Sequence, residues 1–521
     1  MASGPDAEAL AWVHRGWDHL RLQRPLAAWA AWQRALRLKP GDPAAGQALD
    51  LLASAADLPA AARATYRFRP PRDDAARVRW DARFRDRAMD DLEVAAETFR
   101  DLADSVPADA PARYNQALCL TWMGENVAAI AGLDRSVRLD AAPCFEAAVE
   151  AWMLAEILRQ GGGAEGLTDD LNHTLTLHWP AEEDPVTWLR SFANLRPGNA
   201  PVDARPFEWL DRPMPGPDAV RIVDDLPRVR ASVIAIPGLL RFSSPDLPDI
   251  LGVEAELAGA IGERPASFER RSAPLPLAMM DAEVFRSRLP EGLDETTRHQ
   301  LIRGLVERYF ENLWVHSPRH ALGATLDDPH DTMTPAVLAA KIPSDPGPGP
   351  GGAEARARLE AVIRIREQLA ARPSVAGLYG GYPFDRLRRR LGLEPRDPAT
   401  SDPADISCMS AVELDRLDPA TLDDRMLAEA FESALFIGSS AAGRFADALS
   451  DRNSDLLALN SLPVVLAVAC QLAGGAESGR ALAWLDRSIR YDETRLGGRH
   501  RDDLLQLRRE IGLSPDPEDE T

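Results

Sequence analysis

Residues 27–40 read AAWAAWQRALRLKP, and this stretch decides the fold because its pattern recurs along the chain. Ala28, Trp32 and Ala35 place a small, a large and a small side chain on one face of a helix. A small residue followed four positions later by a large one returns at spacings of 34, 33 and 34 residues. The recurring pairs are Ala28 with Trp32, Ala62 with Tyr66, Ala95 with Phe99 and Ala129 with Leu133. A fixed period of this kind predicts an array of repeated helical units.

Composition offers another explanation for the alanines. The chain is rich in alanine and arginine, and Lys39 and Lys341 are its only lysines, as is typical of a high-GC genome. Such a bias multiplies alanines by chance. It does not place a large side chain four residues after a small one in four successive units, so the spacing favours a true repeat.

The first unit carries further positions of a known pattern, with an aromatic and a glycine in its first half and a proline at its end. These positions are Trp12, Gly16, Ala28, Trp32, Ala35 and Pro40. The fourth unit keeps Ala117, Gly124, Ala129 and Leu133, but has Ser136 and Ala141 in place of the last alanine and the proline. In these residues the chain resembles the tetratricopeptide repeat (TPR) family. The resemblance implies antiparallel helix pairs that stack into an α-solenoid.

The rest of the chain predicts further parts. We expect a mainly α protein with TPR-like helical hairpins over 9–200, a small mixed α/β module over 201–343, a Pro/Gly linker over 344–355 and a helical region over 356–513. In the middle module, RASVIAIPGLLRFSS (230–244) predicts a strand, a turn and a second strand, and DAVRIVDDL (218–226) predicts another strand. Near the C-terminus, Ala481, Leu485 and Ser488 have the repeat spacing, which predicts a TPR-like unit at about 455–492.

Charge and composition limit the classes of partner. The formal net charge is −21, from 60 basic and 81 acidic residues, which argues against nucleic acid and anionic membranes as partners. The start of the chain has no secretion signal and no apolar run is long enough to span a bilayer, so we expect a cytoplasmic protein. Four cysteines stand singly in apolar contexts and are expected to be small buried residues: Cys119, Cys144, Cys408 and Cys470.

Two clusters of polar residues have the composition of a binding site. HSPRHALGATLDDPHD (316–331) contains His316, His320 and His330 among aspartates, but Pro318 interrupts the helix that a metal site would need, so we expect a solvated loop. The basic run at Arg386, Arg388, Arg389 and Arg390 is expected to form ion pairs with neighbouring helices. No nucleotide, hydrolase or zinc motif occurs, so the sequence predicts no catalytic residue, metal or cofactor.

The resemblance implies a function as well, because TPR proteins bind partners on the concave face formed by the first helix of each unit. The positions that would line this groove are Val13, Trp17, Leu20, Arg21, Trp80, Phe84, Arg87, Tyr114, Leu118 and Trp122. The groove would be aromatic, and Val13 and Trp17 depart from the family's clamp for a terminal carboxylate. We therefore expect a scaffold that binds a protein or peptide partner, through an apolar helix or an extended segment.

Three alternatives stay open at this point. In the first, this chain's own middle module covers the aromatic groove in place of a partner. In the second, an enzyme active site lies in the middle α/β module with the repeats as regulatory arms, and a deep polar pocket is expected in 201–340. In the third, the repeats mediate self-association.

Overall fold

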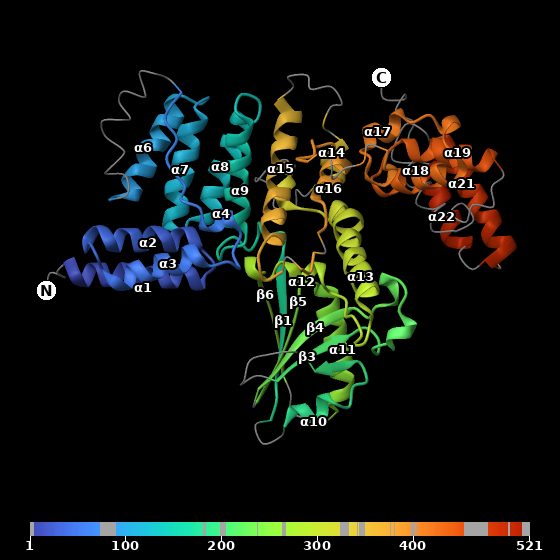
Figure 1. The fold of residues 1–521 in the computed structure, drawn as a ribbon, viewed down its shortest axis with the longest axis horizontal. Coiled ribbons are helices and arrows are strands. Elements are labelled where there is room, and N and C mark those ends of the chain that lie inside the picture. The colour runs from blue at the N-terminus through green and yellow to red at the C-terminus, as the bar shows by residue number, and fades with distance from the viewer. Residues whose placement is uncertain are drawn as a thin grey trace. The chain divides into compact units, whose positions relative to one another are not determined.

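The structure is a computed structural model of the whole chain. It describes residues 5–72, 90–180, 184–197, 205–236, 238–262, 267–323, 333–340, 342, 350–375, 377–379, 381–397, 402, 404–452, 478–496, 498 and 501–512. The chain is mostly helical, with a small antiparallel sheet of six strands in its middle (Figure 1). Its residues form two compact units, of which the first comprises Met1–Phe310, Pro318–Met333 and Pro348–Tyr382.

The first unit begins with a series of helices that pack against their neighbours in the chain. They are α1 (Pro5–Arg21), α2 (Pro25–Leu38), α3 (Pro43–Ser54), α4 (Ala60–Arg63), α6 (Leu92–Ser105), α7 (Ala110–Met123), α8 (Asn126–Asp140) and α9 (Phe145–Arg159). The contacts run from α1 to α2, and then from α6 through α7 and α8 to α9 (Figure 1). A helix from much later in the chain, α15 (Pro350–Ala370), continues this series by packing along α9.

Local signals in the sequence explain where several of these helices begin and end. The carboxylates of Asp42, Asp91 and Asp109 accept hydrogen bonds from backbone N–H groups in the first turns of α3, α6 and α7. Gly124 ends α7 with a φ of 84°, a left-handed conformation that favours glycine. These caps satisfy backbone groups that a helix leaves unpaired at its ends.

The four alanines that define the period are all buried, with exposed fractions between 0% and 3%. The second unit nevertheless departs from a helix pair. Its second helix, α4, is one turn long, and Tyr66 lies beyond it in an extended segment. The prediction that Ala62 and Tyr66 share a helix face is therefore wrong. Two prolines, Pro70 and Pro71, are consistent with an extended backbone here, because proline cannot donate a helical hydrogen bond.

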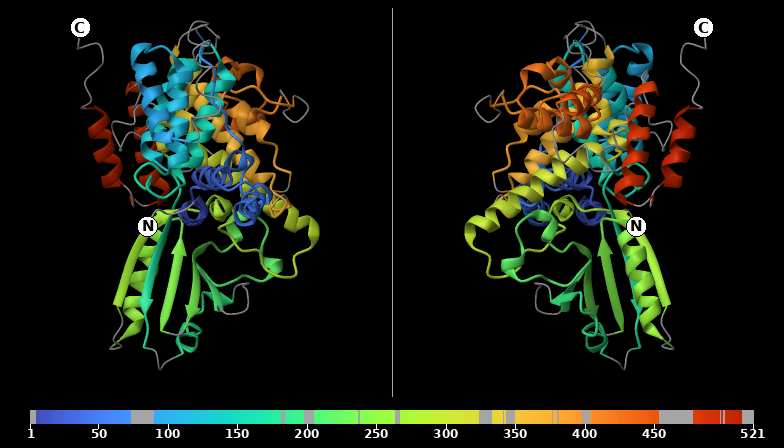
Figure 2. Two further views of the ribbon diagram at one scale, coloured as in Figure 1. Left: turned by 90° about the vertical axis from the view of Figure 1, so that its left-hand side faces the viewer. Right: turned by 90° about the vertical axis from the view of Figure 1, so that its right-hand side faces the viewer.

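The sheet is antiparallel throughout and has the strand order β2-β3-β4-β5-β1-β6. Its strands are β1 (Leu171–His178), β2 (Leu195–Pro197), β3 (Arg205–Leu210), β4 (Val229–Ile236), β5 (Leu239–Ser244) and β6 (Ser267–Pro274). Two of them, β1 and β2, lie before residue 201, so the prediction that helical repeats extend to residue 200 is wrong for these segments. Alternate residues of β4 are buried, and α11 (Leu247–Ile261) covers this face with Ile250, Val253 and Leu257 (Figure 2).

The two strand predictions had different outcomes. The hairpin expected over 230–244 is confirmed, since β4 and β5 pair with Ile236 opposite Leu239. The strand expected over 218–226 is wrong: this stretch forms two 3-10 turns, η1 (Pro217–Ala219) and η2 (Val223–Asp225). The Asp225 carboxylate accepts hydrogen bonds from the N–H groups of Arg221 and Ile222, which closes a local turn in place of strand pairing.

Further helices of the first unit lie between the strands or follow them in the chain. They are α10 (Pro185–Leu189), η3 (Leu277–Met279), α12 (Asp281–Val284), α13 (Glu295–Glu307) and η6 (His320–Leu322). A π-helical turn, η4 (Arg308–Leu313), directly follows α13 in the chain.

The second unit comprises Glu311–Ser317, Thr334–Gly347 and Pro383–Thr521. Its helices are η5 (Trp314–His316), α14 (Pro335–Ala340), α16 (Phe384–Arg390), η8 (Ile406–Cys408), α17 (Ala411–Arg416), η9 (Pro419–Thr421), α18 (Asp424–Phe436), α19 (Ala441–Asp451), α21 (Ser478–Tyr491), η10 (Asp492–Leu496) and α22 (Arg501–Gly512). Phe431, Phe445 and Leu485 lie in its core. Of the predicted repeat unit at 455–492, residues 455–477 lie outside the described residues.

Other expectations can be compared with the described residues. The predicted linker overlaps the first turns of α15, which begins at Pro350. Cys119 and Cys408 are buried as expected. The prediction is wrong for Cys144, which is exposed because it precedes the first turn of α9 rather than lying within a packed helix. Among the described helices, none combines the length and the apolar character that a membrane span requires.

Candidate functional site

The residues predicted to line a concave groove fall into three groups. Val13, Tyr114, Leu118 and Trp122 are buried, with exposed fractions of 5% or less. Trp17 and Leu20 are half-buried, while the Arg21 side chain is 79% exposed and pairs with Asp18. The remaining three, Trp80, Phe84 and Arg87, lie outside the described residues. The buried positions on α7 raise the question of what covers them.

Part of the cover comes from residues 64–72 of this chain, which follow α4 and which we call the extended segment. Asn115, on α7, pairs with the backbone of Arg69 in this segment through both ends of its amide group. The Arg69 N–H donates to Asn115 Oδ1 at 2.8 Å, and Asn115 Nδ2 donates to the Arg69 carbonyl at 2.8 Å. Asn115 is 1% exposed. A side-chain amide paired in this way holds an extended backbone whatever side chain that backbone carries.

The Arg69 side chain is bound by α7, α8 and α9 together, at what we call the Arg69 site. Its guanidinium carbon lies 3.5 Å from the centroid of the Tyr114 ring, and its nitrogens reach Asp140 at 3.4 Å and Glu150 at 3.1 Å. A fourth contact is a hydrogen bond of 2.9 Å to the carbonyl of Ala147. The site therefore combines an aromatic face, two carboxylates and a carbonyl around one guanidinium.

Electrostatics in the Arg69 site depend on burial. The side chain of Asp140 is 1% exposed, and burial raises its carboxyl pKa, although Arg72 and Arg69 oppose this effect. Arg72, at the end of the extended segment, also pairs with Asp140. The Tyr114 hydroxyl donates to Glu150 at 3.0 Å, and burial raises the pKa of this phenol. Two arginines of the segment thus supply positive charge that opposes the effect of burial on the Asp140 carboxyl group.

Aromatic contacts hold the middle of the extended segment. Phe68 lies against Phe99 of α6 and Trp122 of α7, with ring centroids 5.2 Å and 5.1 Å apart. Tyr66 is 8% exposed, and its hydroxyl donates to the carbonyl of Ala61 at 3.0 Å. Trp122, predicted to be an exposed groove residue, is covered in part by Phe68.

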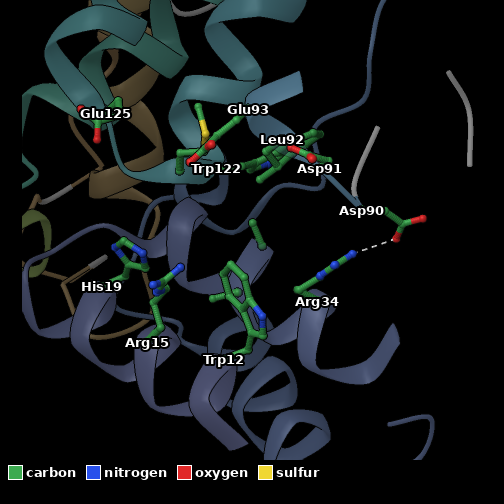
Figure 3. A pocket seen from close by; sticks show the side chains of 13 residues that line it. Trp12, Arg15, His19, Arg34, Asp90, Asp91, Leu92, Glu93, Trp122 and Glu125 are labelled. Atoms are coloured by element: carbon green, nitrogen blue, oxygen red, sulfur yellow. Dashed lines mark hydrogen bonds and ion pairs between the residues drawn. The ribbon is translucent and has the colours of Figure 1, made fainter. Parts of the chain in front are cut away.

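Trp122 also lines a cavity of about 330 Å³ between the α1–α2 hairpin and helices α6 and α7 (Figure 3). We call it the N-terminal cavity. Trp12, Arg15 and His19 face it from α1 (Figure 3). The other residues that line it are Ala30, Ala31, Arg34, Asp90, Asp91, Leu92, Glu93, Trp122, Met123 and Glu125. Its walls therefore carry aromatic, basic and acidic side chains.

His19 is a titratable group in the wall of this cavity. Burial lowers the pKa of His19, and Arg24 and Arg15 lower it further, so the imidazole is neutral at pH 7. Its Nδ1 is buried and has no hydrogen-bond partner among the described residues. Gly124 allows this close approach, because a Cβ at that position would come within 2.9 Å of the His19 ring.

A second concentration of charge lies where the sheet meets the helices of the first unit. Asp170, just before β1, accepts from Arg319 at 3.1 Å and from Arg366 of α15 at 2.8 Å. The three side chains are each 6% exposed or less. Asp169 accepts backbone hydrogen bonds from His320 and Ala321. These contacts join segments that are 149 and 196 residues apart in the chain.

Two glutamates in this cluster have strongly shifted pKa values. Burial raises the pKa of Glu156 to about 7, although Arg159 opposes the effect. Burial and the negative charge of Asp170 raise the pKa of Glu283 to about 7. Groups that titrate near neutrality are candidates for proton transfer. Neither glutamate lines the N-terminal cavity. Arginines of the cluster act on both of them, so Glu156 and Glu283 belong to a buried ion-pair network.

The polar clusters singled out in the sequence had separate outcomes. His316 ends η5 and His320 begins η6, while residues 324–332, with His330, lie outside the described residues. The prediction of ion pairs with neighbouring elements is confirmed for Arg386 and Arg389 of the basic run, while Arg388 pairs with Asp385 of its own helix. Arg386 pairs with Glu311 at 3.2 Å and Asp405 at 2.7 Å, and Arg389 with Glu413 at 3.1 Å.

Sequence reasoning missed the residues that make the most specific contacts. Asn115, Asp140 and Glu150 stand at ordinary helical positions, and Arg69 lies in a unit that looked merely degenerate. The one available signal was ATYRFRPPR (64–72) itself, in which aromatic and basic residues alternate before two prolines where a helix was expected.

The chain was compared with known proteins in three ways. No family model, no curated protein and no solved structure matches it.

Proposed function

We propose that this chain is a tetratricopeptide-like scaffold that binds an extended segment of a protein partner on the face formed by α7 and α9. The observation that carries the proposal is the pair of hydrogen bonds between the Asn115 amide and the backbone of Arg69. Backbone recognition by side chains is how a helical surface can hold an extended peptide, since helices have no free backbone edge to offer it.

The chemistry around Asn115 supports the same function. Tyr114, Asp140 and Glu150 surround an arginine, and Phe99 and Trp122 receive an aromatic side chain. Aromatic and arginine contacts are the ones that contribute most to affinity at protein interfaces. Of the two forms of partner expected from the sequence, an apolar helix and an extended segment, these contacts favour the extended one.

The enzyme alternative gains less support. The polar groups that converge near the sheet, such as Asp170 and Arg319, are buried and pair with one another.

A binding experiment with a defined peptide tests the proposal. Residues 64–72 of the full chain are replaced by a Gly/Ser linker of equal length, and a fluorescently labelled peptide of sequence ATYRFRPPR is added. We expect saturable binding by fluorescence anisotropy, with a Kd of roughly micromolar order. A labelled peptide of the same composition in scrambled order is the matched control.

The same titration with Asn115→Ala in the linker variant shows whether the backbone clamp carries the binding. We expect a loss of about tenfold or more, since two hydrogen bonds disappear. Circular dichroism and thermal melting establish that each variant is folded. If the linker variant does not fold, Phe68→Ala combined with Arg69→Ala replaces it. Equal binding of the scrambled peptide, or no binding of either peptide, contradicts the proposed function.

A further inference from the structure

We propose that the Arg69 site selects a partner by an arginine side chain in an extended basic segment, and that residues 64–72 are an internal occupant that this partner displaces. This inference rests on the proposed function. It adds the chemistry of the partner and a means of regulation.

The contacts of the Arg69 site suit arginine better than any other side chain. A planar guanidinium stacks on the Tyr114 ring while its N–H groups reach Asp140, Glu150 and the Ala147 carbonyl in different directions. A lysine ammonium has no plane to stack and three donors on one atom, so it cannot make all of these contacts at once. An arginine at this position of a partner is therefore the expected feature.

Neighbouring positions add to the pattern. Phe68, directly before Arg69, fits between Phe99 and Trp122, and Arg72, three residues later, pairs with Asp140. Arg67 is exposed. The pattern that the site reads is thus an aromatic residue followed by arginine, with a second arginine three positions on. A basic segment of this kind also suits a chain of formal net charge −21, which attracts it over distance.

The way in which the occupant is attached supports exchange. Phe68, Arg69 and Arg72 are held by side chains of α6, α7, α8 and α9 and by the Ala147 carbonyl, and another segment with the same pattern can make the same contacts. Being part of the chain, residues 64–72 act at an effective concentration of about millimolar order, so a partner's segment has to compete with them. Weakening the internal occupant should therefore strengthen the binding of an added peptide.

The test compares the wild-type chain with Arg69→Ala and with Arg67→Ala, the matched control at an exposed neighbouring arginine. The labelled peptide ATYRFRPPR is titrated into each by anisotropy. We expect Arg69→Ala to bind the peptide about tenfold more tightly than the wild type, and Arg67→Ala to bind it as the wild type does. Equal affinity of Arg69→Ala and wild type would overturn the internal occupant and leave the proposed function intact.

A second peptide tests the arginine. In it, citrulline replaces the arginine that corresponds to Arg69, which keeps the shape and removes the charge. We expect its affinity for the Arg69→Ala chain to fall at least tenfold, and an unchanged affinity overturns the arginine preference. If neither peptide binds either the Arg69→Ala chain or the linker variant, the proposed function itself fails.

Hydrogen exchange on the wild-type chain gives a readout that does not depend on the folding of a variant. With excess unlabelled peptide, the amide of Arg69 should lose protection while amides in the core of α7 keep theirs. Retained protection at saturating peptide means that the segment is not displaced, which overturns the proposal. Light scattering tests whether the segment bound at the Arg69 site comes from a second copy of this chain. A dimer that dissociates when peptide is added would show this, and would overturn the proposal of a separate partner protein.

Discussion

Asn115 binds the backbone of Arg69 through both its donor and its acceptor, each hydrogen bond being 2.8 Å long, although the two residues are 46 positions apart. The pair joins an extended stretch of chain to the middle of a buried helix. Asn115 is 1% exposed, so both hydrogen bonds are buried at their Asn115 end.

Asn115→Ala is therefore expected to lower the free energy of unfolding by about 1–3 kcal/mol, from two lost hydrogen bonds and the unpaired backbone groups of Arg69. Urea unfolding measures this change, and amide exchange at Arg69 should become faster. Gln116→Ala, at the next position of α7, is the control and should stay within about 0.5 kcal/mol. Normal exchange at Arg69 in Asn115→Ala would show that the clamp does not hold the segment.

Replacement of a helical glycine by alanine should change the free energy of unfolding in opposite directions at Gly16 and Gly46. A Cβ at Gly16 would collide with the indole of Trp32, which is 0% exposed and donates from Nε1 to the Val13 carbonyl at 3.2 Å. Gly16→Ala is expected to cost about 1–3 kcal/mol through overpacking. Gly46 in α3 has no neighbour within 4 Å of such a Cβ, so Gly46→Ala should gain up to about 1 kcal/mol from helix propensity. If the melting temperatures of the two variants move in the same direction, the described packing of α1 on α2 is contradicted.

The ion pairs of Asp170 should matter far more than those on the surface. Asp170→Asn removes the anion that Arg319 and Arg366 share in a buried setting, and is expected to destabilise the protein by about 3–5 kcal/mol. Asp18→Asn is the matched control, because Asp18 pairs with Arg21 where both side chains are more than half exposed. Its effect should stay below about 1 kcal/mol. Similar denaturant midpoints for the two variants would contradict the buried network.

Stability should fall as the pH rises from about 5 to about 7.5. The folded pKa of Glu156 and of Glu283 is about 7, against 4.5 for an ordinary glutamate, so the folded state holds protons that the unfolded state releases. The stabilisation is present below pH about 4.5 and is lost as the pH rises through about 7.

Urea midpoints measured across this range should have a shallower slope in Glu156→Gln, whose amide cannot titrate. Glu97→Gln, an exposed residue of α6, is the control and should keep the wild-type slope. An identical slope in Glu156→Gln and in the wild type would contradict the raised pKa of Glu156.

The sequence predicted those features that depend on neighbours along the chain. The spacing of Ala28, Ala62, Ala95 and Ala129 identified four buried positions, since a helix that packs on its neighbours repeats its small residues at the period of the packing. The β4–β5 hairpin over 230–244 was predicted for the same reason, because β-branched residues and a Pro-Gly turn are local signals. The prediction of a strand over 218–226 was wrong because the Asp225 carboxylate closes a local turn there. The pattern of hydrophobic residues does not reveal such a turn.

The candidate site was decided by the tertiary structure. The sequence selected Tyr114 and Trp122, but it gave no sign that residues 64–72 would lie against them, or that Arg69 would meet Glu150 from 81 positions away. Nor did it show that Asp170, Arg319 and Arg366 would meet in the interior. The physical reason is that a hydrophobic period records which face of an element is buried, whereas a single ion pair or amide clamp between distant segments leaves no period. Such contacts exist only once the helices have brought their partners together.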